Sequence, residues 1–348
     1  MAARKQNTPT DEVLDARKAA ILRRVVAEHI ESGQPVGSAH IVREGAVDVS
    51  PATVRADMAA LEREGYLTHP HTSAGRIPTD KGYRFFVDSL EEPSALDPAH
   101  EEQVRNFFAR AHGELERMLR DTSQLLSRLT DYAAVVVGPA HDALSVHSLL
   151  LTRLGPRVCL LVVVLSNGAV EKHVVDVPEE TTDEEIDAAA AALREQLIGK
   201  RLGALGQPRR SGRRALDGIV SACHRALAGV REVGDADEVF VGGAARMAEQ
   251  FRAVDTVREV LAILEQSFVV VSLIRDVLAQ GQSVSIGTEH GVSSLAECSL
   301  VVAPYTVDER VVGTIGVLGP TRMDYRHALA AVAVVSERLG RQLSGGGE

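Results

Sequence analysis

Residues 50–64 read SPATVRADMAALERE, a sequence that predicts the central helix of the first part of the chain. Ser50 belongs to the residue types that cap helices, and Pro51 follows at the first helical position, where its missing N–H costs nothing. Gly65 supplies the end of the helix. The apolar positions recur at helical spacing and share one narrow arc, which we expect to face a core: Val54, Met58 and Leu61.

The opposite arc of this helix carries small residues and arginines. Alanines there let a helix approach DNA closely, and base contacts come mainly from the first turns of such a helix. Arg55 can reach a guanine edge or a phosphate, and Thr53 can reach a phosphate or a thymine methyl group. Any amphipathic surface helix also exposes arginine and alanine, so this helix alone does not distinguish a DNA-binding helix from an ordinary surface helix. The candidate DNA-contacting residues are Ser50, Ala52, Thr53, Arg55, Ala56, Ala59 and Arg63.

The segments on either side of this helix favour the DNA interpretation. Hydrophobic spacing, caps and turn residues indicate an ordered series of short elements. The series is a helix (15–32), a turn (34–37), a short helix (38–43), the helix above, a strand (66–70), a loop (71–76) and a return strand from Ile77. This order is typical of a winged helix-turn-helix, which we place in residues 1–92.

The loop after the first strand fits the wing of such a domain. It contains small hydroxyl residues, a glycine and one arginine, which we expect near its tip. Wings touch phosphates or the minor groove, where arginine is the preferred probe. His69 and His71 also suggest a metal site, but no third ligand lies nearby, so we expect no metal. The candidate wing contacts are His71, Thr72, Ser73, Gly75 and Arg76.

The charge balance neither requires nor excludes a nucleic-acid partner. The 348 residues carry a net charge of −10. Residues 1–90 contain 12 Lys/Arg and 12 Asp/Glu, whereas the rest contains 26 and 36 and accounts for the whole excess. Trp is absent and aromatic residues make up only 3%, which disfavours a protein that stacks bases on aromatic rings. DNA binding therefore rests on the arrangement of residues and not on charge totals.

Other chemistry finds little support. Three cysteines, Cys159, Cys223 and Cys298, lack metal-ligand spacing and indicate reduced thiols. No signal peptide or membrane span is evident, so we expect a soluble, cytoplasmic protein. The glycines 313, 316 and 319 have the wrong spacing for a phosphate loop and predict a buried strand. Because no catalytic constellation is present, we expect neither an enzyme nor a cofactor.

The second part of the chain predicts an α+β domain over residues 99–345. Residues 99–130 are predicted to be helical, and strand-like and helical runs then alternate to the end. The strand-like runs are Ala133–Val137, Leu144–Thr152, Val158–Leu165, Ala169–Val177, Val239–Val241, Ser283–Ile286, Ser299–Pro304 and Arg310–Val317. The helical runs are Asp183–Ile198, Ala215–Leu227, Val257–Leu264, Phe268–Leu278 and Met323–Leu343. The basic run over 209–214 is expected to be a solvated loop, with a second DNA contact as the alternative.

Several blocks resemble the HrcA family of heat-inducible transcription repressors. The blocks span nearly the whole chain, and the second and last are the most specific. They are SPATVR at 50–55 with MAALE at 58–62, HTSAGRIPTDKGYR at 71–84, PVGS at 35–38, Ile286–Gly287 with Glu289, Leu295 with CSLV at 298–301, and GTIGVLGPTRMDY at 313–325.

The resemblance implies more than the residues alone. It implies a winged helix-turn-helix followed by a GAF-like α+β domain, interrupted by an inserted dimerisation subdomain at about 178–265. It implies a homodimer that binds CIRCE, an inverted-repeat operator in double-stranded DNA, and represses chaperone operons of the groE and dnaK type until heat stress. It also implies that the chaperonin GroEL helps to keep the repressor active.

The chain departs from the family pattern at three positions. Ala56, Arg246 and His290 stand where asparagine is usual. If that first asparagine reads the operator, this chain lacks its contribution. Two other classes remain open: a ligand-gated winged-helix regulator whose GAF-like domain senses a small molecule, and an enzyme with an accessory DNA-binding domain.

Overall fold

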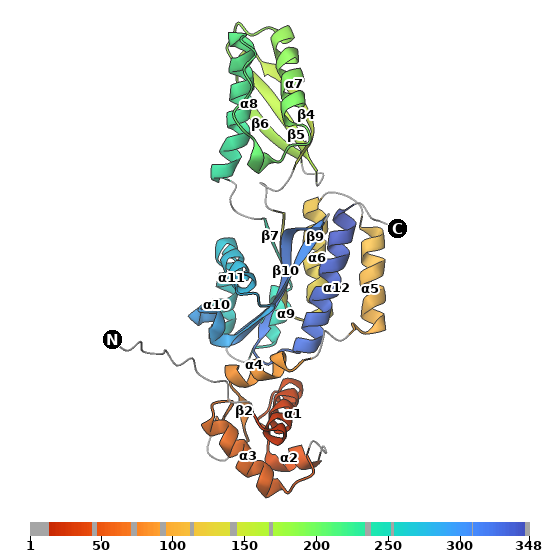
Figure 1. The fold of residues 1–348 in the computed structure, drawn as a ribbon, viewed down its shortest axis with the longest axis vertical. Helices are drawn as coiled ribbons and strands as arrows, with labels where there is room; N and C mark the ends of the chain where they lie inside the picture. The colour runs from red at the N-terminus through yellow and green to blue at the C-terminus, as the bar shows by residue number, and fades with distance from the viewer. Residues whose placement is uncertain are drawn as a thin grey trace, which may run out of the picture.

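The computed structural model describes residues 14–43, 47–70, 75–90, 95–111, 115–139, 145–166, 170–233, 238–251, 254–307 and 309–344. Three units follow one another along the long axis of the molecule (Figure 1). We call them the N-terminal unit (residues 14–90), the body (95–139 and 238–344) and the inserted unit (145–233). Within the described residues, no helix combines the length and the apolarity needed to cross a lipid bilayer.

The N-terminal unit contains four helices and a two-stranded antiparallel ribbon among its described residues. The predicted helices are confirmed within a residue or two, and Gly33 ends the first with a positive φ of 62°. The elements are α1 (Ala16–Ser32), α2 (Ser38–Arg43), α3 (Pro51–Arg63), β1 (Leu67–Thr68), β2 (Ile77–Pro78) and α4 (Asp80–Asp88).

The body is built on a five-stranded antiparallel sheet in the order β7-β3-β10-β9-β8. Its strands are β3 (Ala133–Val137), β7 (Val239–Gly242), β8 (Val284–Ile286), β9 (Cys298–Val307) and β10 (Arg310–Pro320). Its helices are α5 (Pro98–Arg110), α6 (Leu115–Thr130), α9 (Ala244–Glu249), α10 (Val254–Leu264), α11 (Ser267–Ala279) and α12 (Tyr325–Leu343), with short 3-10 turns at Gly287–His290 and Ser293–Leu295. The predicted strand over the three glycines is confirmed as β10.

Helices cover both faces of this sheet (Figure 1). Successive residues of a strand point to opposite faces, so a strand between two helical layers is apolar throughout. In β3, Val136 joins the core formed with α6 and α12. Its neighbour Val135 joins the core formed with α10 and α11. The prediction that residues 99–130 are helical is confirmed over most of that stretch. The structure has two helices there, α5 and α6, and the sequence carries the poor helix former Gly113 between them.

The N-terminal unit and the body share one continuous hydrophobic core. Leu22 and Val54 of the former and Val301 and Val335 of the latter belong to the same cluster. The two units meet at α4, where the ring centroids of Tyr83 and Tyr325 lie 6.0 Å apart. The N-terminal unit is therefore packed onto the body and not merely tethered to it.

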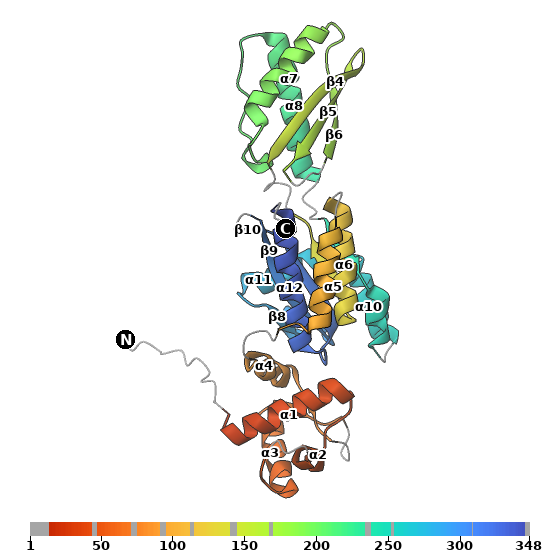
Figure 2. The ribbon, with the colours of Figure 1, turned by 90° about the vertical axis from the view of Figure 1, so that its right-hand side faces the viewer.

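The inserted unit is a three-stranded antiparallel sheet, β4-β5-β6, with two helices on one face (Figure 2). Its elements are β4 (Val146–Gly155), β5 (Val158–Leu165), β6 (Val170–Asp176), α7 (Asp183–Leu197), a 3-10 turn (Leu202–Ala204) and α8 (Arg214–Val233). The chain leaves the body after β3 and returns at β7, and these two strands pair directly.

The bounds of about 178–265 expected for the insertion are wrong. The three strands over 146–176 belong to it, because they share a core with α7 and α8. The segment over 239–264 belongs to the body, because β7 pairs with β3 and α10 packs on the body's sheet. The local pattern identified these strands correctly, but it carries no information on which sheet each one joins.

Candidate nucleic-acid interface

Helix α3 lies at the end of the molecule farthest from the inserted unit (Figure 1). The Ser50 Oγ accepts a hydrogen bond from the Thr53 N–H at 3.2 Å, which caps the helix as predicted. The three residues predicted to face the core are buried: Val54, Met58 and Leu61. On the opposite arc, Ser50, Ala52, Arg55, Ala56 and Arg63 are exposed, whereas Thr53 and Ala59 are half-buried.

Two ion pairs that the sequence did not indicate fix α3 against α1. The Arg17 guanidinium donates to both carboxylate oxygens of the buried Asp57, at 2.8 and 3.2 Å. Just beyond the end of α3, the Lys18 ammonium donates to Glu64 at 2.6 Å. The partners lie 40 and 46 residues apart, so no local pattern could have revealed them. They hold the exposed arc of α3 on a rigid support.

The foot of the predicted wing is tied to the turn before α2. Val36 and Arg76 exchange two backbone hydrogen bonds, of 2.8 and 2.9 Å. Gly75 is required there, because a Cβ at this position would lie 2.5 Å from the Val36 carbonyl oxygen. His71, Thr72 and Ser73 lie outside the described residues. Their predicted contacts with DNA stay predictions.

Arg76 lies at this foot, beside β2, and the expectation that it lies near the tip is wrong. Its Nε is 2.7 Å from a carboxylate oxygen of Glu62 on α3, and His69 contacts the other oxygen of the same carboxylate. Burial acts to raise the pKa of Glu62, but the hydrogen bond to His69 and the charge of Arg76 outweigh it, so this pKa lies below its ordinary value. Glu62 therefore joins α3 to the wing.

Helix α4 clamps the N-terminal unit to the body. Asp80 accepts hydrogen bonds from the N–H and the hydroxyl of Thr288, at 2.9 and 2.8 Å. Arg84 forms a two-pronged ion pair with Glu289 and donates to the Val284 carbonyl at 2.9 Å. The ion-pair partner stands 205 residues away, beyond the reach of a local pattern.

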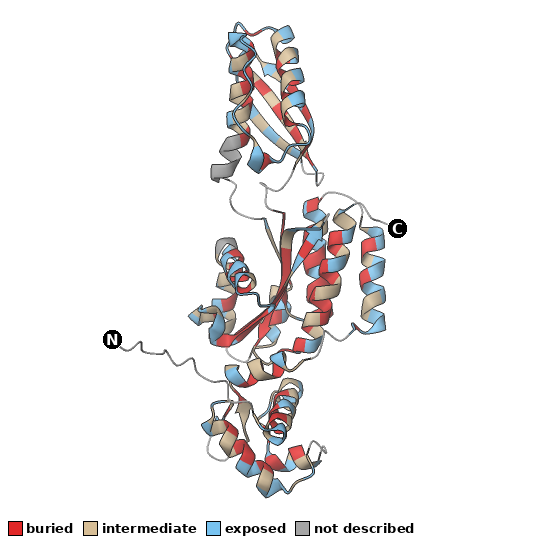
Figure 3. Ribbon diagram, in the orientation of Figure 1, coloured by how far each residue is buried: buried red, intermediate tan, exposed pale blue. Residues whose placement is uncertain are grey.

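The inserted unit presents an uncovered apolar sheet face. Inward residues of β5 such as Leu161 and Val163 are buried under the helices. Exposed apolar residues lie on β4 and β6, and half-buried apolar residues of β5 lie between them. This face includes Leu150, Leu160, Val162, Val164, Val170 and Val174, of which Leu150 is 51% exposed and Val174 67% exposed. Figure 3 shows the contrast with the buried strands of the body.

Only one histidine of the pair expected at the wing can be placed in the structure. His69 is engaged with Glu62, and across the described residues no group of three or more His, Cys, Asp or Glu side chains is arranged to hold a metal ion. The other end of the predicted pair, His71, lies outside the described residues.

Comparison with known proteins gives matches along the whole chain. Residues 116–329 match the family described as the HrcA protein C terminal domain. The chain is 36% identical to the heat-inducible transcription repressor HrcA of Symbiobacterium thermophilum, over 94% of this chain and 98% of that protein. It is 38% identical to the protein of the same name from Acidothermus cellulolyticus, over 95% and 99%.

A solved structure described as a hypothetical protein shares the fold. It superimposes with a TM-score of 0.64 at 21% sequence identity, over 96% of this chain and 100% of that one. Both of the named relatives of this chain are called transcription repressors.

Proposed function

Because the chain belongs to the HrcA family of heat-inducible transcription repressors, we propose that it silences chaperone operons by binding a CIRCE-type inverted repeat. It acts in the cytoplasm, as a dimer, and leaves the operator on heat stress. The main support for the proposal is the exposed arc of α3, which consists of small residues and arginines. The helix is capped at its start and held against α1 by two ion pairs.

In this proposal α1, α2, α3 and the β1–β2 ribbon form a winged helix-turn-helix, and α3 enters the major groove. Ala52 and Ala56 let the helix approach the base edges, and Arg55 reaches them. Ser50 and Thr53 contact a phosphate at the start of the helix, while Ala59 and Arg63 follow the groove wall. The wing residues, with Gly75 and Arg76 at the foot, meet the flanking backbone.

The dimer forms through the uncovered face of β4–β6 in the inserted unit. A strand such as β5, apolar at every position from Val158 to Leu165, is expected where both faces are covered. Only one face is covered by helices of this chain, so a second copy supplies the other cover. A two-fold axis through this sheet would hold two α3 helices at a fixed spacing, as an inverted repeat requires.

Heat acts on the body and the inserted unit, which we propose to be a GAF-like domain and its dimerisation insertion. Loss of their packing separates the two α3 helices, and the affinity for the operator falls with the dimer. A chaperonin of the GroEL type raises the active fraction, because folding that depends on the chaperonin makes this fraction follow the amount of free chaperonin.

A gel shift at fixed salt tests the proposal. The full chain is titrated against a CIRCE-type inverted repeat, against a scrambled duplex and against a single half-site. We expect the inverted repeat to bind about 10³-fold more tightly than the scrambled duplex. Equal affinity for all three duplexes would contradict the proposal.

A second measurement tests the heat response. Dimer content and operator affinity are followed from growth temperature through the heat-shock range, with and without chaperonin. We expect both to fall together and chaperonin to shift the fall to higher temperature. An affinity that stays constant through the range, with no chaperonin effect, would overturn the release mechanism and leave operator recognition to the first test.

A further inference from the structure

A cleft lies between the N-terminal unit and the body, on the side of α4 away from the Arg84 clamp. Its volume is about 700 Å3. Residues of α1 and α4 line one side, and residues at the end of β10 and the start of α12 line the other. Pockets between domains of this volume hold small ligands in many proteins. Because both units line it, its shape depends on how they are placed relative to each other.

Aromatic and aliphatic side chains line the cleft together with arginines. Phe86 is buried in its wall, and Ile30 and Tyr132 line it beside Phe86. The Tyr132 hydroxyl accepts a hydrogen bond from the Asp324 N–H at 2.9 Å, so its ring is held in place. A planar organic group would find apolar contact on this side of the cleft.

Arginines outnumber acids in the lining, and one of them, Arg24, is also paired with Glu28 at 3.5 Å. Three arginines, Arg24, Arg322 and Arg326, face two acids, Glu31 and Asp324. The carboxylate of Asp324 caps α12 by accepting from the His327 N–H at 3.0 Å, which uses part of its capacity. The Arg322 guanidinium donates to the Gln250 carbonyl at 2.7 Å, and that of Arg326 lies 5.9 Å from the Phe86 ring. The guanidinium of Arg326 thus stands beside the aromatic wall, and that of Arg322 lies on the Gln250 side of the same cleft.

We propose that this cleft binds a small organic anion, a carboxylate or phosphate carried on a ring, and that its binding couples to operator affinity. The acid group lies between Arg322 and Arg326, and the ring lies on Phe86 and Tyr132. Guanidinium groups bind both oxyanions through charge-assisted hydrogen bonds. Since the ligand touches both units, it favours one placement of the N-terminal unit, and its affinity and the operator affinity change each other by the same factor.

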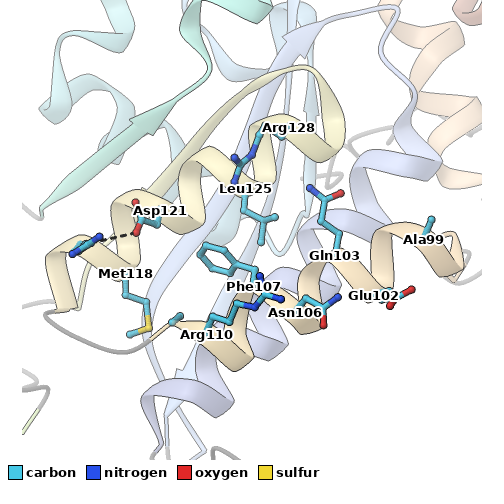
Figure 4. A pocket seen from close by; sticks show the side chains of 12 residues that line it. Ala99, Glu102, Gln103, Asn106, Phe107, Arg110, Met118, Asp121, Leu125 and Arg128 are labelled. Atoms are coloured by element: carbon cyan, nitrogen blue, oxygen red, sulfur yellow. Dashed lines mark ion pairs between the residues drawn. The ribbon is translucent and has the colours of Figure 1, made fainter.

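A second hollow in the body does not have this property. The groove between α5 and α6 has a volume of about 720 Å3, and Phe107 points into it beside Leu125 (Figure 4). One of its arginines, Arg117, is paired with Asp121 at 3.8 Å. All of its lining comes from the body, so a ligand there would have no direct contact with the N-terminal unit.

Thermal denaturation of the full chain tests the binding half of the proposal without DNA. Benzoate and phenyl phosphate are the charged probes, and benzamide is the neutral probe of the same size. We expect at least one charged probe to raise the melting temperature and benzamide to have little effect. Arg326→Met removes one cation at an exposed position and is expected to weaken the apparent affinity about tenfold or more.

The matched control is Arg338→Met, which removes an arginine from the same helix outside the cleft. It should respond to the probes as the wild type does. Binding is overturned if neither charged probe shifts the melting temperature, or if Arg326→Met and Arg338→Met respond equally. Arg322→Lys gives a second check, because it keeps the charge and loses the planar fork, so its affinity should lie between those of the wild type and Arg326→Met.

The coupling half rests on the proposed function, and the gel shift tests it separately. Operator affinity is measured with benzoate, with phenyl phosphate and with benzamide, for the wild type and Arg326→Met. We expect the probe that binds to change the affinity of the wild type only. If a probe binds the cleft without changing the operator affinity, the coupling is overturned. If the protein fails to bind the operator under all conditions, the proposed function is overturned, and ligand binding in the cleft is then judged by the thermal measurement alone.

Discussion

The two ends of the molecule carry opposite kinds of uncovered surface. At one end, α3 exposes alanines and arginines on a helix held rigidly from behind. At the other, the sheet of the inserted unit exposes leucine and valine. The first surface suits a polyanion, which supplies the missing charge, and the second suits a copy of itself, which supplies the missing apolar cover. The chemistry of each uncovered surface thus indicates which kind of partner it binds.

The largest effect is expected from charges in the inserted unit. Leu150→Asp combined with Val174→Asp places carboxylates on the uncovered face, where a second copy would have to bury them. We expect a monomer by light scattering and operator binding that falls about 10³-fold, to the non-specific level. Ala191→Asp, on the exposed side of α7, is the matched control and should leave both unchanged.

Two outcomes would contradict the assignment of the dimer interface to the inserted unit. A double variant that stays dimeric would place the dimer interface elsewhere. A monomeric variant that binds the inverted repeat as tightly as the wild type would show that the inserted unit does not set the spacing of the two α3 helices.

The next effect concerns Arg55 at the other end. Its side chain is exposed, and Arg55→Ala should cost about 1–3 kcal/mol on the operator and relax the sequence preference, if the guanidinium pairs with a base. Gel shifts on operator and random duplexes measure both. Arg23→Ala, an exposed arginine on α1, is the control and should have little effect on preference. Equal losses of affinity on both duplexes would reassign Arg55 to a phosphate.

A smaller and more even effect is expected at the foot of the wing. Arg76→Ala should weaken binding to all duplexes similarly and lower the salt slope by about one, as the loss of one phosphate contact does. The ion pair with Glu62 offers a discriminating partner variant. Glu62→Gln keeps the arginine and removes its carboxylate partner, so it should not reduce the salt slope. If both variants lose affinity without any change in slope, Arg76 acts by holding the wing to α3.

The sequence was sufficient for most of the helices and strands and for the buried face of α3, because these follow from short-range periodicity and capping. The buried positions of that helix, Val54 and Met58 among them, are where 3.6-residue spacing places them. What it missed depends on distant partners. Neither the Arg17–Asp57 pair nor the Arg84–Glu289 pair leaves a local trace.

The limits of the insertion were missed for a related reason. The strand β5 is apolar at every position, which is also true of β3 in the centre of the body. A local pattern cannot distinguish a strand covered by its own helices on both faces from one that leaves a face for a second copy. Only the pairing of β3 with β7 shows where the body resumes.

A smaller effect is expected in the order in which the inserted unit and the body unfold on heating. Cys159 and Cys223 are fully buried in the inserted unit and Cys298 is fully buried in the body. The inserted unit has its own separate core, whereas the body shares one with the N-terminal unit, so the inserted unit should open at lower temperature. Alkylation with iodoacetamide followed by peptide mapping should label Cys159 and Cys223 before Cys298. Simultaneous labelling of all three would indicate that the molecule opens as one cooperative unit.

The pH dependence of unfolding tests whether Cys223 is buried in the folded protein. Burial raises the pKa of Cys223 from 9.0 to about 12 and raises that of Cys298 equally, so both thiols stay protonated in the folded protein at pH 8. A folded-state pKa above the unfolded value contributes stability that is complete below pH 9 and declines as the pH rises toward 12. Cys223→Val removes this contribution and should make the alkaline loss of stability shallower than in the wild type. An identical alkaline unfolding curve for both would mean that Cys223 is already exposed to solvent before the inserted unit opens.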